Sequence, residues 1–552
     1  MVIVPDTDII LIKSPLKLDE TNQLTFSNTT EQYNYFSSLT HFEYEGCTYQ
    51  RKDGVIRYDT NQEENGIPTG NPKFEDLLQY NYCMYKNDSY ENKWFYAYVT
   101  DVKYVNDGMT EITIETDVFQ TWQFDIQYMN SFIEREHVAS DGVGEHTIPE
   151  GLETGEYICN AVGNLASNMK NCYVCAMTTE IPDGISANTF HPRYGGVFCG
   201  GCLIVFQDWQ SACNFTRGAD EVNKPEAITA MFMVPQSLVG TLGSWELCKW
   251  KDNTSNPIHN FSCQIVPYTD SETLLANTSI SLQTTLNGYA PKNNKLLTFP
   301  YNYFYVSNTT GADVEFRYED FVNNAPSFKT LGTLTPGCSI RSVPINYKKL
   351  SDTGTSYNHF NCGIPGPKYP MCSWINDPFT NWLTEQSVNN SLGFFGGIAG
   401  VGVGAALAIS GVGTAAGVGL IGGGIGSIIN TMKGYYEHSQ IPPQTKGNTN
   451  TGDVAFASGS FEQPYYKMSI RYEYAKMIDD YFSMYGYKVN RLATPNIHKR
   501  SKWDFIKCID VNLEGNIPEL DLAKIRDLFN NGCTFWHTTT NFLDYSQTNS
   551  IL

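Results

Sequence analysis

One segment of the chain, which begins at Gln386, carries no Asp, Glu, Lys or Arg until Lys433. Glycine and aliphatic residues dominate it. Two apolar runs within it, Leu392 to Ile409 and Val412 to Ile429, would each span about 27 Å as helices, close to a bilayer hydrocarbon core of about 30 Å. We therefore expect an apolar, Gly-rich loop insert at residues 386–433 that acts on a membrane.

Side-chain composition makes membrane insertion marginal for a single copy of this segment. The large apolar residues of each run favour membrane insertion by about 3 to 4 kcal/mol, and the many glycines cancel part of this favourable free energy. Glycines four residues apart let helix backbones approach closely in lipid, so association of copies should favour insertion. The side chains expected to be membrane-active are Leu392, Phe394, Phe395, Ile398, Val401, Leu407, Ile409, Val418, Leu420, Ile421, Ile425, Ile428 and Ile429. The glycines expected at helix contacts are Gly396, Gly400, Gly404, Gly413, Gly417, Gly422 and Gly426.

Three alternatives stay open for this segment: a flexible linker, a soluble buried helical hairpin and a constitutive transmembrane hairpin. Linkers are normally polar, because exposed aliphatic side chains aggregate. A constitutive span is normally flanked by a basic cluster on its cytoplasmic side, and the sequence beside this segment has none. We favour conditional insertion, in which apolar loops are shielded inside an oligomer and released on a trigger.

The chain as a whole has a sheet-rich composition. Of its 552 residues, 13% are aromatic and only 17% are charged, which favours sheets and large interfaces over solvated helices. This length can bury at least two independent cores. The net charge of −21 argues against a nucleic-acid reader, which needs clustered Lys and Arg. We expect a mainly β, multidomain protein that does not retain DNA.

Residues 1–135 are predicted to form a first tube-like β domain, a barrel or sandwich. Apolar and polar residues alternate over 94–105 and over 109–119, as expected for half-buried strands. Asn106-Asp107-Gly108 lies between these two stretches, and Asp-Gly readily adopts the positive φ angles of a tight hairpin turn. We therefore predict a β-hairpin centred on Asp107.

Residues 136–385 are predicted to form a second β domain, and residues 434–552 a small α+β part that completes the body. Strand patterns in these two regions fall at 172–179, 200–207, 227–235, 261–268, 296–308, 312–321 and 465–474. Helical periodicity covers 475–487 and 518–532, where Pro518 begins the second helix and Gly532 ends it. Aromatic runs such as 461–467 are expected in the core or at subunit interfaces.

The fifteen cysteines are expected to be mostly reduced and buried. The N-terminus lacks the basic and apolar pattern of a secretory signal, so we expect synthesis in a cytoplasm. Cys172, Cys175, Cys199 and Cys202 have the spacing of a four-thiolate zinc site. Cys172 and Cys175 lie in a stretch that is typical of a buried strand, so ordinary thiols are the favoured interpretation and zinc an alternative.

No catalytic constellation emerges, and we expect neither an enzyme nor a cofactor or metal. Residues 134–137, Glu-Arg-Glu-His, lie near Glu145 and His146, but the spacing fits no metal or acid–base template. We expect salt bridges between subunits and strand-end hydrogen bonds there, and a packed structural corner at Trp536 and His537. Nucleotide-binding and nucleophile motifs are missing from the sequence.

Three stretches resemble the tail-knob family of phi29-like short-tailed bacteriophages. They are Thr116 to Val138 continued by His146 to Tyr157, the Gly-rich insert itself, and Gly515 to His537. With their order and the total length they span most of the chain, although residues 160–380 carry no specific match.

The resemblance implies a homohexameric β tube at the virion tail tip, made in the host cytoplasm and joined to other phage tail proteins. The apolar loops would plug its lumen, then enter the host cytoplasmic membrane and form a channel through which genomic DNA passes without specific binding. Two rivals remain: a secreted-type pore-forming toxin, which should carry a secretion signal, and a tail-associated cell-wall hydrolase, which needs a catalytic site.

Overall fold

The structure is a computed structural model of the 552-residue chain. It describes residues 7–47, 50–59, 63–64, 67–68, 72–87, 93–166, 171–185, 193–198, 201–222, 224–250, 259–308, 313–348, 363–372 and 461–552.

The chain forms two compact units that interleave along the sequence. Unit 1 comprises Met1–Thr154, Tyr289–Leu296 and Tyr472–Leu552, and unit 2 comprises Gly155–Gly288 and Leu297–Arg471. The sequence analysis instead divided the chain into four segments that follow one another in sequence. That division stays a prediction.

Unit 1 is built mainly from strands. Its strands are β1 (Thr7–Ile12), β2 (Asn22–Leu24), β3 (His41–Cys47), β4 (Val55–Asp59), β5 (Glu63–Glu64), β6 (Ile67–Pro68), β7 (Tyr82–Asn87), β8 (Trp94–Asn106), β9 (Met109–Thr116), β10 (Gln127–Tyr128), β11 (Ser131–Glu136), β28 (Tyr487–Ala493), β29 (Trp503–Asp510), β30 (Leu513–Glu514) and β31 (Cys533–Trp536). Its helices are α1 (Thr29–Ser38), α2 (Phe74–Leu77), α3 (Val118–Trp122), α9 (Tyr472–Tyr485) and α10 (Glu519–Asn531).

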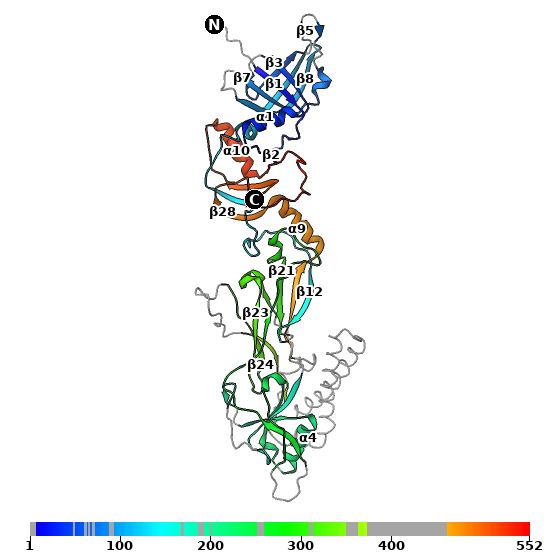
Figure 1. Cartoon of the computed structure of the whole chain (residues 1–552), viewed down its shortest axis with the longest axis vertical. Helices are drawn as coiled ribbons and strands as arrows, with labels where there is room; N and C mark the ends of the chain where they lie inside the picture. The colour runs from blue at the N-terminus through cyan, green and yellow to red at the C-terminus, as the bar shows by residue number, and fades with distance from the viewer. Residues whose placement is uncertain are drawn as a thin grey trace, which may run out of the picture. The chain divides into compact units, whose positions relative to one another are not determined.

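A six-stranded antiparallel sheet, in the order β3-β1-β7-β8-β9-β4, carries two cores. Alternate residues of β1 point to opposite faces, so Ile9 and Leu11 enter one hydrophobic cluster while Ile10 and Ile12 enter another. Helix α1 lies next to this sheet (Figure 1). Its residue Phe36 contributes to the second core. Burial on both faces explains why β1 is continuously apolar from Ile9 to Ile12.

The two edges of this sheet approach each other. Strands β3 and β4 lie at opposite ends of the strand order, yet both supply side chains to the same cluster. The ring centroids of Tyr44 in β3 and Tyr58 in β4 are 5.1 Å apart in an edge-on contact. The sheet is therefore strongly curled, as expected for a barrel-like β domain.

The hairpin predicted at Asp107 is confirmed. Strands β8 and β9 pair antiparallel, with Asn106 opposite Met109. The Asn106 side chain accepts a 2.9 Å hydrogen bond from the Gly108 backbone N–H, which closes the turn.

The second sheet of unit 1 contains the C-terminal region. Its order is β2-β31-β29-β11-β28, and helices α9 and α10 both contact β29. The two predicted helices are confirmed, but α9 ends earlier than expected, at Tyr485. Gly486 takes a φ of +62°, and a side chain there would collide with the Glu136 backbone, so this glycine turns the chain into β28.

The short segment 289–296 is held in unit 1 by a buried carboxylate on α9. Asp479 is fully buried and accepts hydrogen bonds from the Tyr289 hydroxyl at 2.8 Å, the Lys292 backbone N–H at 2.8 Å and the Asn293 backbone N–H at 3.0 Å. The Asn293 side-chain amide donates a further bond of 2.8 Å. One carboxylate therefore satisfies four donors, which compensates for its removal from water.

In its described residues, unit 2 contains three larger sheets and two α-helices. Its strands are β12 (Tyr157–Asn164), β13 (Cys172–Thr178), β14 (Arg193–Tyr194), β15 (Val197–Phe198), β16 (Cys202–Phe206), β17 (Ile228–Pro235), β18 (Glu246–Cys248), β19 (Phe261–Ile265), β20 (Thr273–Ser279), β21 (Asn302–Ser307), β22 (Asp313–Phe316), β23 (Ser327–Gly332), β24 (Ser339–Pro344), β25 (Ile364–Lys368), β26 (Met371–Cys372) and β27 (Pro464–Ile470). The α-helices in this described part are α4 (Trp209–Glu221) and α5 (Gln236–Val239).

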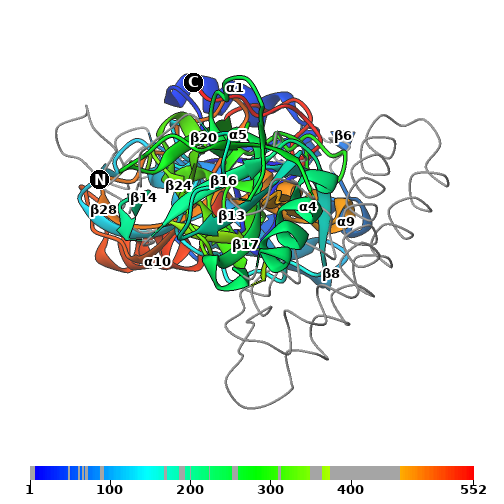
Figure 2. The same ribbon diagram turned by 90° about the horizontal axis from the view of Figure 1, so that it is seen from below.

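The six-stranded sheet β18-β19-β16-β13-β17-β26 is buried on both faces. Figure 2 shows β13, β16 and β17 together, with α4 beside them. Leu203 and Val205 of β16 enter one core, while Ile204 and Phe206 enter the core under Phe215 of α4. The two other larger sheets, β20-β23-β24-β25 and β12-β27-β21-β22, supply side chains to the first core and to a third one. The mainly β class predicted from composition is therefore confirmed.

Replacing Asp479 with Ala is predicted to lower the free energy of unfolding of unit 1 by about 3 kcal/mol, because four buried donors lose their acceptor. The matched control is Asp480→Ala, since the Asp480 carboxylate is half exposed and lies 3.9 Å from the Lys292 ammonium. We expect the control to change stability by less than about 0.5 kcal/mol. Urea unfolding followed by far-UV circular dichroism measures both, and equal losses would contradict the role of Asp479.

Candidate functional site at the anchor of the apolar segment

The residues predicted to be membrane-active, and the glycines predicted to pack between helices, all lie within 373–460, outside the described residues. The described chain does contain both flanks of this stretch. On one side are β25 and β26, and on the other is Phe461 followed by β27. We call the four residues Tyr369, Met371, Phe461 and Gln463 the anchor.

The incoming flank is fixed by backbone hydrogen bonds to two sheets of unit 2. Strand β25 pairs with β24, and the Tyr369 backbone N–H donates to the Cys338 carbonyl at 2.9 Å. Strand β26 then pairs with β17, with Met371 opposite Phe232. Next to that pair, the Met233 backbone N–H donates to the Pro370 carbonyl at 2.9 Å. This flank is therefore held up to the last described residue, Cys372.

The outgoing flank enters the interior immediately. Phe461 is 3% exposed, and Gln463 is fully buried. The Leu165 backbone N–H donates to the Gln463 carbonyl at 2.9 Å, and strand β27 continues between β12 and β21. The assignment of residues 461–467 to the core is confirmed for Phe461 and Gln463.

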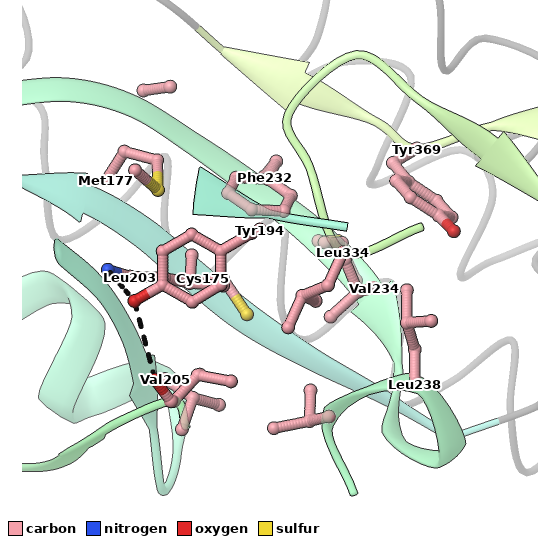
Figure 3. Packing of buried hydrophobic residues seen from close by; sticks show 14 of the residues in the cluster. Cys175, Met177, Tyr194, Leu203, Val205, Phe232, Val234, Leu238, Leu334 and Tyr369 are labelled. Atoms are coloured by element: carbon pink, nitrogen blue, oxygen red, sulfur yellow. Dashed lines mark hydrogen bonds between the residues drawn. The ribbon is translucent and has the colours of Figure 1, made fainter. Parts of the chain in front are cut away.

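Both flanks meet in one hydrophobic core. The ring centroids of Tyr369 and Phe461 are 6.0 Å apart, and both rings belong to the same cluster as Phe232 and Leu334. Figure 3 shows Tyr369 in this core, near Leu334 and Phe232. Burying each aromatic ring is worth about 2 to 3 kcal/mol, so the anchor is a strong local contact.

The anchor gives the chain between residues 373 and 460 two neighbouring fixed ends. Because Tyr369 and Phe461 pack in one core, the intervening chain starts and finishes at one place on unit 2. The entropic cost of closing a loop between two neighbouring ends rises only slowly as the loop becomes longer. Such a geometry can carry a segment that changes conformation without pulling the sheets apart.

Among the described residues, no helix combines the length and the apolar character that a membrane crossing requires.

The cysteines of the zinc alternative are only partly placed. Cys172 and Cys175 lie on β13 and Cys202 lies on β16, whereas Cys199 lies outside the described residues. In the β13–β16 register Cys202 is opposite Thr178, three residues from Cys175, which separates the two along the ladder by about 10 Å. Burial raises the pKa of Cys172 to about 12. The described part favours ordinary buried thiols, and the zinc alternative stays untested.

The acidic and basic residues 134–136 find ionic partners within their own chain. Glu136 is fully buried and binds Arg491 and Lys499, the former at 2.5 Å. Arg135 pairs with the buried Glu150, and Glu134 pairs with Lys507 at 2.8 Å. Strands that are distant in sequence bring these partners together within unit 1. The expected salt bridges to a neighbouring subunit stay a prediction.

His137 is a buried imidazole whose two ring nitrogens are both occupied. The Phe505 backbone N–H donates to Nδ1 at 2.8 Å, and Nε2 lies 3.2 Å from the Ser483 carbonyl oxygen, to which it donates. This pattern requires the neutral ring. Burial, opposed by the nearby Asp504 carboxylate and assisted by Arg500, lowers the pKa of His137 to about 4.

Trp536 and His537 form the packed corner that the sequence predicted. Trp536 is fully buried and its ring lies 5.0 Å from that of Trp503. His537 lies with Nε2 3.0 Å from the Asp504 carboxylate and Nδ1 2.8 Å from the Thr25 hydroxyl. Asp504 in turn accepts the backbone N–H groups of residues 499 and 500. These contacts are structural hydrogen bonds.

Sequence reasoning missed the pairing of the two flanks. Tyr369 stands in a Pro-rich stretch without clear periodicity, and nothing local connects it with Phe461, which is 92 positions later.

Family comparisons place the chain among phage tail proteins. Residues 268–550 match the model of the C-terminal domain of the Bacillus phage phi29 tail knob protein gp9. Residues 6–127 match a model of the N-terminus of caudoviral major tail proteins.

Individual relatives match over nearly the full length. The chain is 26% identical to the tail knob protein gp9 of Bacillus phage PZA, covering 96% of each chain. It is 25% identical to the tail knob protein gp9 of Bacillus phage phi29, covering 98% of each chain. Its fold is similar to that of the bacteriophage C1 tail knob protein gp12, with a TM-score of 0.62 at 14% identity over 99% of this chain and 100% of that one.

Replacing Phe461 with Ala is predicted to lower the free energy of unfolding of unit 2 by about 3 to 4 kcal/mol, because it leaves a cavity beside Tyr369. The control is Tyr466→Ala on β27, whose half-buried ring stacks on Tyr305 at 4.8 Å and should cost about 1 kcal/mol. Differential scanning calorimetry measures both variants. A loss at Phe461 no larger than that at Tyr466 would refute the anchor.

Unit 1 is predicted to lose stability on acidification through His137. The pKa of the ring is lower in the folded chain, about 4, than its ordinary value of 6.5, so the unfolded chain binds the proton more tightly. The stabilising contribution is complete above about pH 6.5, falls as pH drops, and is lost by about pH 4, a change of about 3 kcal/mol.

A His137→Gln variant should show a flatter stability profile between about pH 4 and about pH 6.5 than the parent protein, because its side chain does not titrate. The matched control is His41→Gln at the exposed start of β3. Urea unfolding at a series of pH values gives the profiles. Parallel profiles for the parent and His137→Gln would exclude this histidine as an acid-labile contact.

Proposed function

Because the chain belongs to the family of the phi29 tail knob protein gp9, whose members are structural proteins of the phage tail, we propose that it forms the distal tail tube or knob of a short-tailed bacteriophage. In this proposal it plugs the DNA channel with its apolar segment, releases that segment on infection, and penetrates the host cytoplasmic membrane for genome ejection. The observation that carries the proposal is a charge-free segment whose two flanks return to one core.

The proposed assembly is a homohexameric ring at the virion tail tip that contacts other tail proteins. One apolar hairpin enters a bilayer only marginally, whereas several copies gain helix packing through closely spaced glycines. A ring supplies those copies at a high local concentration. It also offers a lumen in which apolar loops are kept from water before infection.

The anchor supports a segment that can be released while the tube stays intact. Its flanks are held by β-ladder hydrogen bonds and by the Tyr369–Phe461 contact, all within unit 2. Movement of the intervening chain therefore leaves the sheets in place. This separation suits a part that must leave the lumen while the tube continues to guide DNA.

Charge supports passage of DNA without retention. The net charge of −21 per chain repels phosphate groups, and tight nucleic-acid binding needs clustered Lys and Arg. A conduit works best when it does not bind its cargo. Synthesis in the host cytoplasm, followed by incorporation into the virion, completes the proposal.

The proposal predicts that removal of residues 392–429 abolishes membrane leakage while leaving the body folded. Both anchor rings stay in place in this deletion, so unit 2 keeps its core. Dye release from anionic liposomes, followed between about pH 4 and about pH 7.5, compares the deletion with the full chain. Circular dichroism and negative-stain images of rings show whether the body and assembly are preserved.

A second variant in the same experiment separates membrane binding of the segment from association of its helices. Gly400→Leu keeps the segment apolar but blocks close approach of helix backbones, so leakage should fall by more than about tenfold while the protein still binds liposomes. Leakage that is equal for the full chain and the deletion would refute the membrane role. Loss of leakage only in variants that fail to form rings would assign the effect to assembly.

A further inference from the structure

Two sheets of unit 2 pack face to face and leave two outer faces. Phe304 of β21 and Phe316 of β22 come from the sheet β12-β27-β21-β22, and Phe328 of β23 and Ile364 of β25 come from the sheet β20-β23-β24-β25. All four side chains belong to one hydrophobic cluster. Because side chains alternate along a strand, the residues next to them point away from this cluster. The two sheets therefore form a β-sandwich whose outer faces point in opposite directions.

The outer face of the sheet β12-β27-β21-β22 is rich in tyrosine. Residues that are opposite each other in an antiparallel register share a face of the sheet. The residues opposite Tyr303 and Tyr305 on β27, and those opposite them in turn on β12, therefore point outward as well. We call this set the tyrosine face: Cys159, Val162, Tyr303, Tyr305, Tyr466 and Met468. Val162 is 61% exposed, and Cys159 is exposed too. Tyrosine and methionine are enriched at protein interfaces.

The tyrosine face is acidic along β22, the last strand of its sheet. Glu315 is opposite Tyr305, and Asp313 lies two residues earlier on β22, so both carboxylates point outward. Both side chains are exposed. The Arg317 guanidinium, just after β22, lies over the Phe299 ring at 3.9 Å. Two carboxylates and one cation give this edge a net negative charge.

The outer face of the other sheet is basic. On β23 and β24, Lys329 and Arg341 alternate with buried residues, so both point outward. Lys368 of β25 is opposite Ser339, two residues before Arg341, and points the same way. The Arg341 guanidinium is paired with the Glu272 carboxylate at 2.5 Å. We call Lys329, Arg341 and Lys368 the basic face. Three cations and one carboxylate give it a net positive charge.

We propose that the tyrosine face of one copy packs against the basic face of the next copy. This inference rests on the proposed function, because it names the surfaces that join the subunits of the proposed ring. The partner is a second copy of this chain, since one sandwich carries both members of a pair of oppositely charged faces. A contact between two different faces of the same body repeats from copy to copy and can close into a ring.

Apolar side chains on both faces favour the same contact. On the basic face, Leu274 is 49% exposed and lies opposite Leu331. Packing against the tyrosine face would remove Leu274, Val162 and the Cys159 thiol from water together. Two tyrosine faces, by contrast, would bring carboxylates of like charge together, which disfavours a symmetric pairing of that face with itself.

Charge reversal on each face tests the proposal. The first variant carries Asp313→Lys with Glu315→Lys, and the second carries Lys329→Glu with Lys368→Glu. Each should lower the amount of ring at equal protein concentration by more than about tenfold, because two faces of like charge then meet. An equimolar mixture of the two variants should form rings again, because each reversed face then meets an oppositely charged neighbour. Size-exclusion chromatography with light scattering and negative-stain images measure assembly.

The control is Glu226→Lys, which reverses an exposed charge outside both faces and should leave assembly unchanged. Circular dichroism shows that each variant is folded. Variants that assemble as well as the parent protein, or folded variants whose mixture forms no rings, would overturn the proposal. Absence of rings from the parent protein would refute the proposed ring itself.

Cys159 gives a second measurement that leaves the tyrosine face unchanged. Its alkylation by iodoacetamide, mapped by mass spectrometry, should be more than about tenfold slower in parent rings than in single chains of the Lys329→Glu, Lys368→Glu variant, because burial shields a thiol from reagents. Equal rates would show that the tyrosine face stays open in the ring and would overturn the proposal.

Discussion

The packing of Tyr369 against Phe461 is the contact on which the organisation of unit 2 depends. These rings close a stretch of chain that the sequence marks as unlike the rest, because it lacks acidic and basic residues over more than forty positions. A body that carries such a stretch needs fixed ends for it. The anchor supplies them by combining buried aromatic area with β-ladder hydrogen bonds on both sides.

Unit 1 is assembled from three separate stretches of chain, which must be held together in the fold. Buried carboxylates hold these stretches: Asp479 accepts donors from 289–296, and Glu136 binds Arg491 and Lys499. Each carboxylate is removed from water, and its cost is offset only because charged or backbone donors surround it. His137 is a buried polar group of another kind in unit 1, because it keeps both of its hydrogen bonds only as the neutral ring.

Local pattern predicted the elements well. Alternation located the strands β8 and β9 and the turn at Asp107, and 3.6-residue periodicity located α9 and α10. The end of α9 was misplaced because Gly486 occurs within an apparently continuous helical pattern, and only its packing against Glu136 reveals the turn. The ionic partners within the chain were not predicted, because a sequence does not show that Arg491 and Lys499 return to β11.

By itself, the sequence determined the mainly β class, the acidic character, the location of several strands and the charge-free segment, since all of these depend on composition and short-range periodicity. Tertiary structure alone decided that residues 289–296 belong with the C-terminal helices and that Tyr369 meets Phe461. Such contacts join residues from about ninety to nearly two hundred positions apart. Their partners are selected by shape and by the satisfaction of buried polar groups in three dimensions, and neither quantity leaves a periodic trace along the chain.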